Sequence, residues 1–222
     1  RYKNLIGVTL GTGFGCGVVI DKALLTGDNG CGGDTWCMRN RMNPSVIAEE
    51  GVSIRAVRRV YAEMSREEVS NLTPKDICEI ADGTRPGNVK AAKEAFRQLG
   101  QVAAAALVNV LNIVDGIIVI GGGLAGAARH ILPGMMEEFQ RPVGTLSGEM
   151  FPSLQSEIYN LEDVTQRAAF LDDKDIMVDV PHTDKKVLYC NHRKVAVMVS
   201  ELGASKAISL GAYHYAMNQI SK

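Results

Sequence analysis

Apolar residues and glycines divide the start of the chain into short segments, and this pattern predicts three strands. Residues 5–10 are rich in apolar side chains and are expected to form a buried strand. Two shorter apolar segments, 18–21 and 23–26, are expected to form the next strands. The connections between them are tight, which favours an antiparallel meander. The sequence GDNGCGG over 27–33 then predicts a loop.

After this loop the apolar residues recur every three or four positions, which is typical of helices. One helix is expected over about 46–60. A second begins after Thr73, because threonine is a good N-cap and Pro74 suits the first helical position, and it ends at Asp82. A long helix is expected over 86–112.

The second half of the chain alternates strand and helix signals. They comprise a strand over 115–120 that is buried on both faces, a helix over 125–139, a strand over 155–161, a hairpin of 185–189 with 195–200 around residues 190–193, and a helix over 205–219. Three antiparallel strands followed by alternating helices and strands predict an α/β fold. We expect one domain with a mixed sheet, helices on both faces and an all-helical insertion over about 45–113.

Composition narrows the classes of protein to which the chain can belong. The formal net charge is −1 and no basic stripe is present, so we expect no nucleic-acid partner for this segment. The longest apolar runs are too short to span a membrane, so no membrane association is expected. The five cysteines form no closely spaced pair, and their odd number without a signal peptide indicates a reducing cytoplasm.

The sequence GVTLGTGFGCG, residues 7–17, places four glycines two positions apart after the first strand. Glycine weakens a strand, so such a run indicates a tight turn or the close approach of another group. Two interpretations are open at this point. In one, the glycines supply the positive φ of a corner between strands. In the other, the bare backbone presents its N–H groups to a phosphate.

A second glycine cluster, residues 121–126, follows a strand and opens a helix. It contains Gly-x-Gly-x-x-Gly, but a dinucleotide site also needs an acidic residue about twenty positions on, at the end of the next strand. The candidates Glu149, Glu162 and Asp163 are poorly placed. The cluster can instead border an anion or a flat ring at the helix start, or pack the helix closely on the strand. Two clusters on one sheet favour a nucleotide.

Several segments resemble the ROK family of bacterial sugar kinases. Residues 8–17 resemble its phosphate-binding hairpin, and 18–30 resemble its next strand and glycine loop. Residues 118–123 resemble its adenosine motif, and 203–216 resemble its closing helix. The resemblance implies an actin/hexokinase-like ATPase fold of the ribonuclease H-like type. It also implies transfer of the γ-phosphoryl group of ATP, with Mg²⁺, to a hexose such as glucose.

The resemblance carries binding roles over to individual residues. They are, for the phosphates, Gly11, Thr12 and Gly13 and, for adenosine, Gly121, Gly122 and Gly123. Asp34 matches a glutamate that holds sugar hydroxyls in the family, and its shorter carboxylate can accept the same hydrogen bonds. Glu49 matches a further sugar-binding carboxylate, although its neighbour Glu50 is an alternative and both can be solvated helix acids.

The chain departs from the family around the expected sugar site. Trp36 stands where the family has glycine, and it either narrows the space near Asp34 or fills the core behind the loop. Cys37 stands where the family has histidine, and residues 40–46 replace a cysteine-rich zinc loop. Because structural zinc needs four ligands, no structural zinc is expected.

The family's proton acceptor, an aspartate in an Asn-Asp-x-Asn segment, has no match in these 222 residues and is expected upstream of Arg1. The chain is therefore expected to be the C-terminal, large lobe (1–222) of a glucokinase-like enzyme, acting with its own N-terminal lobe and unable to phosphorylate sugar alone. The resemblance also implies a cytoplasmic homodimer that works in carbohydrate metabolism. Two alternatives are a sugar-sensing transcriptional regulator of the same family and a nicotinamide-dependent oxidoreductase that uses residues 121–126.

Overall fold

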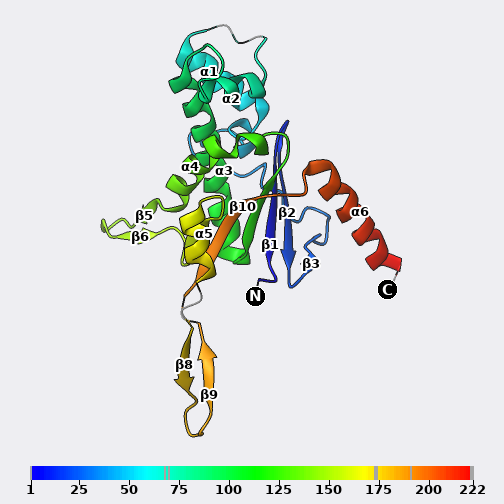
Figure 1. Cartoon of the computed structure of the whole chain (residues 1–222), viewed down its shortest axis with the longest axis vertical. Coiled ribbons are helices and arrows are strands. Elements are labelled where there is room, and N and C mark those ends of the chain that lie inside the picture. Colours follow the sequence, from blue (N-terminus) through cyan, green and yellow to red (C-terminus); the bar gives the residue numbers. More distant parts are fainter. Residues whose placement is uncertain (1, 68, 70, 173–174, 191, 221–222) are drawn as a thin grey trace.

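The computed structural model describes residues 2–67, 69, 71–172, 175–190 and 192–220. Its centre is a six-stranded sheet in the order β3-β2-β1-β4-β10-β7 (Figure 1). The strands are β1 (Leu5–Leu10), β2 (Phe14–Ile20), β3 (Ala23–Leu24), β4 (Ile117–Gly121), β7 (Glu157–Asn160) and β10 (Lys194–Val199). β1, β2 and β3 pair antiparallel, whereas β1, β4, β10 and β7 run parallel. The mixed sheet and the antiparallel meander agree with the sequence prediction.

Six α-helices lie in the described part of the chain. They are α1 (Ile54–Ser65), α2 (Pro74–Ala81), α3 (Val89–Val114), α4 (Ala128–Phe139), α5 (Val164–Leu171) and α6 (Ala204–Ile220). The predicted start of α2 is confirmed, because the Thr73 hydroxyl accepts from the Asp76 N–H at 3.2 Å and the Asp76 carboxylate accepts from the Thr73 N–H at 2.7 Å. The first helix starts at Ile54 rather than near residue 46, because the Ser53 hydroxyl caps it by accepting from the Ala56 N–H.

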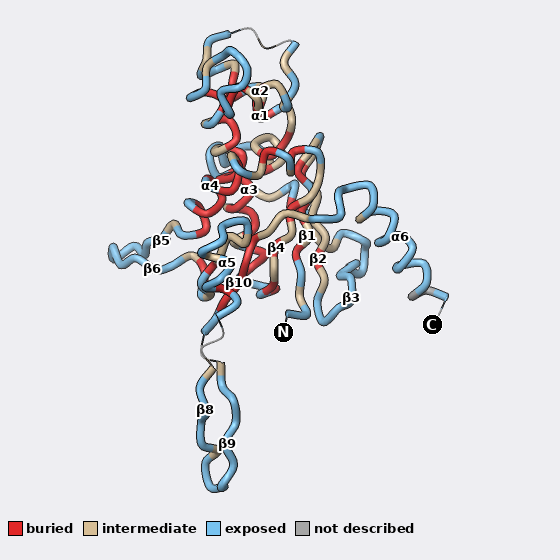
Figure 2. The backbone as a smooth tube through the Cα atoms, viewed as in Figure 1, coloured by how far each residue is buried: buried red, intermediate tan, exposed pale blue. Residues whose placement is uncertain are grey.

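Helices α3 and α4 pack against each other with their backbones in contact. A Cβ atom added at Gly100 would lie 2.2 Å from the Ile131 carbonyl oxygen, and one at Gly134 would lie 2.1 Å from the Arg97 carbonyl oxygen. The buried side chains of β1 and β4 belong to the same apolar cluster as those of these two helices. This buried region runs through the middle of the molecule (Figure 2). One face of the sheet is therefore covered by a tightly crossed helix pair.

The opposite face of the sheet differs from the prediction. In β4, the side chains of Ile118 and Ile120 are buried, but those of Ile117 and Val119 are only partly buried. In β1, Leu5 and Thr9 are exposed, whereas Ile6, Val8 and Leu10 are buried. The expectation that residues 115–120 are buried on both faces is wrong for this chain, because α3 and α4 cover one face only.

The predicted hairpin of 185–189 with 195–200 is also wrong. β9 (Lys186–Tyr189) pairs with β8 (Ile176–Asp179), and the two strands form an arm that projects from the body (Figure 1). β10 instead enters the main sheet beside β4, because its apolar run Val195–Val197 is fully buried there. Asn191, in the expected turn, lies outside the described residues. β5 (Pro142–Gly144) and β6 (Met150–Pro152) form another small hairpin that the pattern did not predict.

Among the described residues, none of the helices combines the length and the apolar character that a bilayer span requires. The long helix α3 carries charged residues in its first half, and nearly all described side chains of the closing helix α6 are exposed. The two glycine clusters lie at the same end of the central sheet, because β1 and β4 pair in parallel and each is followed by one of them.

Candidate functional site

The first glycine cluster forms the turn between β1 and β2. The Gly11 N–H donates to the Gly13 carbonyl oxygen at 3.1 Å, and β2 begins directly afterwards at Phe14. The second strand thus starts four residues before Val18, because Phe14–Val18 pairs with β1 in register. None of the glycines at 11, 13, 15 and 17 has a φ between +20° and +160°. The interpretation in which they supply positive φ is therefore wrong.

Close approach explains two of these glycines. A Cβ at Gly13 would lie 2.6 Å from Glu49 Oε2, and one at Gly15 would lie 2.4 Å from Thr9 Oγ1 on the paired strand. The missing Cβ lets the Glu49 carboxylate reach the turn, where Oε2 accepts from the Phe14 N–H at 3.1 Å. The Gly11 carbonyl oxygen accepts from the Ile54 N–H at 2.9 Å, which ties the turn to the start of α1.

The second glycine cluster contacts the first. Gly122 has a φ of +91°, and a Cβ there would lie 2.4 Å from the Leu10 carbonyl oxygen at the end of β1. The same oxygen accepts from the Leu124 N–H at 2.9 Å. A Cβ at Gly11 would lie only 3.7 Å from the Gly123 nitrogen. Two segments about a hundred residues apart in sequence therefore form one continuous glycine surface.

Two pockets meet at this surface. The hairpin pocket, of about 620 Å³, is lined by the turn residues 11–13 together with Trp36, Glu49 and Gly122. The α2–α4 pocket, of about 410 Å³, is lined by Gly123 and Leu124 on one side and by side chains of α2 and α4 on the other. Because Gly122 and Gly123 are adjacent, one extended ligand can reach from one pocket into the other.

The predicted site residues are distributed unevenly over these pockets. The turn residues Gly11, Thr12 and Gly13 share the hairpin pocket with Glu49. Asp34 is exposed and lines neither pocket, and Gly121, the last residue of β4, lines neither as well.

Sequence reasoning missed the helical wall of the α2–α4 pocket. Its polar residues are Lys75, Cys78, Glu79, Asp82 and Arg129. The Thr73 cap signalled that α2 exists, but no local pattern indicated that this helix faces the second glycine cluster.

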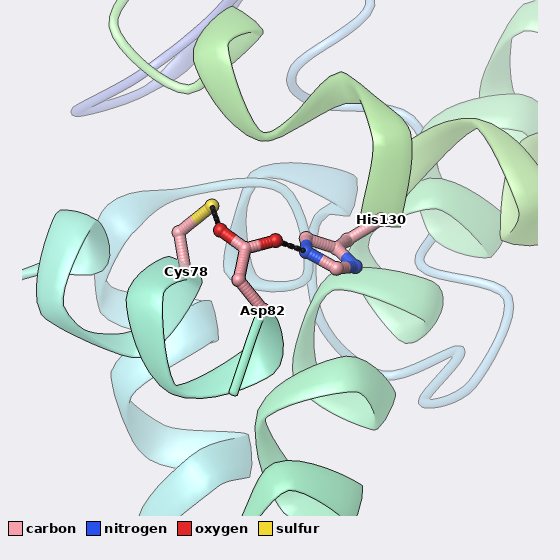
Figure 3. A group of neighbouring side chains, drawn as sticks. All are labelled: Cys78, Asp82 and His130. Atoms are coloured by element: carbon pink, nitrogen blue, oxygen red, sulfur yellow. Dashed lines mark hydrogen bonds and ion pairs between the residues drawn. The ribbon is translucent and has the colours of Figure 1, made fainter. Parts of the chain in front are cut away.

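Three side chains of that region point toward one another: Cys78 in α2, Asp82 after its end, and His130 in α4 (Figure 3). One ligand atom from each lies within 4.8 Å of the others, as in a metal site. However, Arg129 Nε donates to Asp82 Oδ1 at 2.9 Å, its Nη2 donates to Oδ2, and the same nitrogen lies 3.3 Å from Cys78 Sγ. A cation would compete with this guanidinium, and three ligands fall short of the four of a structural zinc site. We describe the group as an ion-paired network.

The network perturbs the titration of its members. The Arg129 guanidinium and the His130 ring, both hydrogen-bonded to Asp82, hold the pKa of its carboxyl well below the usual range. Burial raises the pKa of the Cys78 thiol, and the charge of Arg129 opposes that rise only in part. The network joins the end of α2 to the first turn of α4, so it braces the wall of the α2–α4 pocket.

We predict that Asp82→Asn lowers the melting temperature at pH 7. Because the folded-state pKa of Asp82 is depressed, its stabilisation is present above the unfolded pKa of about 3.9 and is lost as pH falls toward the folded pKa. The difference between the wild type and the variant should therefore shrink below about pH 4. Thermal melts from pH 7 to pH 3 measure it. Asp179→Asn, which removes an exposed carboxylate 3.2 Å from Lys186 Nζ, is the matched control and should change little. An Asp82 effect that is constant with pH would contradict the prediction.

The mixed sheet, with its antiparallel first hairpin and a glycine cluster after β4, is the actin/hexokinase-like ATPase fold. The comparison with known families gives a more specific result. The chain belongs to the ROK family, whose sequence model matches residues 1–145.

Relatives of known structure and sequence agree with this assignment. A glucokinase structure from Parabacteroides distasonis is 47% identical with a TM-score of 0.88, and the match covers 98% of this chain and 59% of that one. A curated glucokinase from Halalkalibacterium halodurans is 29% identical over 159 residues, covering 62% of this chain and 47% of its own. A ROK glucokinase from Streptomyces griseus, solved with glucose and AMPPNP, shares the fold at 24% identity, a TM-score of 0.52 and coverages of 63% and 51%. The chain thus spans about half the length of the curated relative.

Proposed function

We propose that this chain is the large, C-terminal lobe of a glucokinase-like enzyme that transfers the γ-phosphoryl group of ATP to a hexose hydroxyl. The observation that carries the proposal is the contact between the two glycine clusters, which places the two pockets side by side. The similarity to glucokinases supports glucose or a close relative as the acceptor.

In this proposal ATP lies along the glycine surface. The Thr12 and Gly13 N–H groups, with the Thr12 hydroxyl, bind the phosphates, and Gly11, whose N–H already donates to the Gly13 carbonyl oxygen, leaves the turn without a side chain at that position. The α2–α4 pocket receives the adenosine beside Gly122 and Gly123. The glycine surface suits a nucleotide, because side chains at Gly13 and Gly122 would collide with Glu49 and Leu10, and the missing side chains at Gly11 and Gly123 leave the backbone open to a ligand. Gly121, the last residue of β4, is proposed to contribute its backbone to the adenosine site.

Mg²⁺ would bind mainly to the phosphates and neutralise their charge during transfer. The carboxylate of the hairpin pocket, Glu49, already accepts from the Phe14 N–H and lies 3.5 Å from Arg55 Nη2. We therefore assign no residue of this chain as a metal ligand.

The hexose is proposed to occupy the hairpin pocket beside the phosphates. Glu49 accepts hydrogen bonds from its hydroxyl groups, and Asp34 contributes once the other lobe closes over the sugar. The base that accepts the sugar proton is proposed to be the family aspartate upstream of Arg1. The enzyme is further proposed to be a cytoplasmic homodimer of carbohydrate metabolism.

Substitutions in the full-length protein test these roles. Thr12→Val should lower kcat/KM for ATP, and Glu49→Gln should lower kcat/KM for glucose, each by about 10- to 100-fold, because a hydrogen bond involving a charged group is worth about 1.5–3 kcal/mol. Hexose phosphate formation measures both. The matched controls are Thr165→Val on the exposed surface of α5 and Glu50→Gln beside Glu49.

Three results would count against these assignments. Normal kinetics in Thr12→Val would remove the phosphate role, and a loss in Glu50→Gln instead of Glu49→Gln would move the sugar contact to Glu50. Glucose binding without any phosphoryl transfer by the wild type would favour the sugar-sensing regulator. A thermal shift with NADH and none with ATP would favour the oxidoreductase.

A further inference from the structure

Trp36 is an aromatic side chain in the hairpin pocket that the functional roles above do not use. It is the single tryptophan of the chain, it is 42% exposed, and it shares the pocket with Glu49 and the turn residues. An indole that filled the core would be buried, so the core-filling interpretation of this residue is wrong. The indole instead lines the hairpin pocket, where a bound ligand can contact it.

The backbone at Trp36 and Met38 is hydrogen-bonded to the segment that carries Glu49. The Glu49 N–H donates to the Trp36 carbonyl oxygen at 3.1 Å, and the Ala48 N–H donates to the Met38 carbonyl oxygen at 2.7 Å. On the other side, Thr35 is buried. Trp36 and Glu49 therefore lie on two segments whose backbones are hydrogen-bonded to each other. This pairing fixes the position of the indole relative to the Glu49 carboxylate.

This pair of groups selects for a particular kind of ligand. A carboxylate accepts hydrogen bonds from hydroxyl groups, so the part of the pocket near Glu49 suits a polyol. An indole face binds apolar surface and, by the charge distribution of its ring, attracts the polarised hydrogens of C–H groups. A hexopyranose offers both, because its hydroxyl groups lie around the ring edge and its C–H groups lie on the ring faces.

We propose that Trp36 is a specificity-determining residue whose indole packs on the C–H face of the hexose ring while Glu49 binds its hydroxyl groups. This inference rests on the proposed function, because it places the acceptor sugar in the hairpin pocket. It assigns a binding role to a position where the resemblance to the family predicts glycine. Trp36 orients the ring and contributes to the affinity for sugar, and it takes no part in proton transfer.

Two variants of the full-length protein test the role. Trp36→Leu keeps an apolar side chain without an aromatic face, and Trp36→Phe keeps a smaller face. We expect Trp36→Leu to raise KM for glucose about tenfold and Trp36→Phe to raise it no more than about threefold, since an aromatic contact is worth about 0.5–1.5 kcal/mol beyond its buried area. Neither variant should change KM for ATP, and kcat should stay within about threefold of the wild type.

Tryptophan fluorescence gives a readout that does not depend on turnover. Glucose should change the emission of the wild type, and this change should be clearly smaller in Trp36→Phe, which still binds glucose. An unchanged glucose KM in Trp36→Leu, or a glucose response of equal size in Trp36→Phe, would overturn the inference while the kinase proposal stands. A response that depends on Trp36 in a wild type that transfers no phosphate would support the inference while the kinase proposal fails.

Discussion

Replacing Gly122 by alanine is expected to destabilise the fold strongly and to abolish the stabilisation of the protein by ATP. Gly122 has a φ of +91°, and the new Cβ would lie 2.4 Å from the Leu10 carbonyl oxygen and 2.7 Å from the Leu10 nitrogen. A side chain in this conformation costs about 1–3 kcal/mol by itself, and the contacted atoms are backbone atoms of a core strand that cannot move aside. We expect the free energy of unfolding to fall by about 3 kcal/mol or more.

Gly123→Ala is the matched control for Gly122→Ala. Gly123 lines the α2–α4 pocket, its φ lies outside the left-handed range, and a Cβ there would meet no atom within 4 Å. The free energy of unfolding of Gly123→Ala should stay within about 0.5 kcal/mol of the wild type. Urea unfolding and thermal melts with and without ATP measure both variants. Equal stability of the two variants would contradict the close contact between the glycine cluster and β1.

Replacing Gly134 by alanine is expected to disrupt the crossing of α3 and α4. The added Cβ would lie 2.1 Å from the Arg97 carbonyl oxygen and 2.9 Å from the Arg97 carbonyl carbon. Helix propensity alone would favour alanine by about 0.5–1 kcal/mol, so any loss reports the packing of the two helices. We expect the free energy of unfolding to fall by about 2–3 kcal/mol, because the helices must move apart throughout the core.

Gly211→Ala in α6 separates propensity from packing. A Cβ there would meet no atom within 4 Å, so this variant should be as stable as the wild type or more stable by about 0.5–1 kcal/mol. Denaturant unfolding of both variants provides the comparison. If Gly134→Ala gains stability like Gly211→Ala, the two helices are not in backbone contact.

Elements with strong local signals were predicted well. The Thr73 cap, the apolar strand Leu5–Leu10 and the long helix that became Val89–Val114 all agree with the structure to within a few residues. Their signals come from hydrogen bonds and side-chain periods within one or two turns, which act the same way in any tertiary context.

Predictions that required a choice of partner were less reliable. The pattern predicts that the segment 185–189 pairs with the strand that follows it, but this segment pairs with Ile176–Asp179. The spacing of the glycines in the first turn predicts a tight turn, a phosphate site or the close approach of another group, but it does not say which group approaches. The structure shows that Gly13 and Gly15 accommodate side chains of other segments. Pairing and close contact depend on distant residues, which local patterns do not report.

By itself the sequence determined the mixed α/β character, the antiparallel first hairpin and the two glycine clusters, because propensity, turn chemistry and hydrophobic period are local properties of the chain. Only the tertiary structure decided that Glu49 lies against Gly13, that Gly122 lies against Leu10, and that α2 forms the far wall of the second pocket. These contacts join residues from about 35 to more than 100 positions apart. They depend on how the tightly crossed helices and the sheet pack together, and no short segment carries that information.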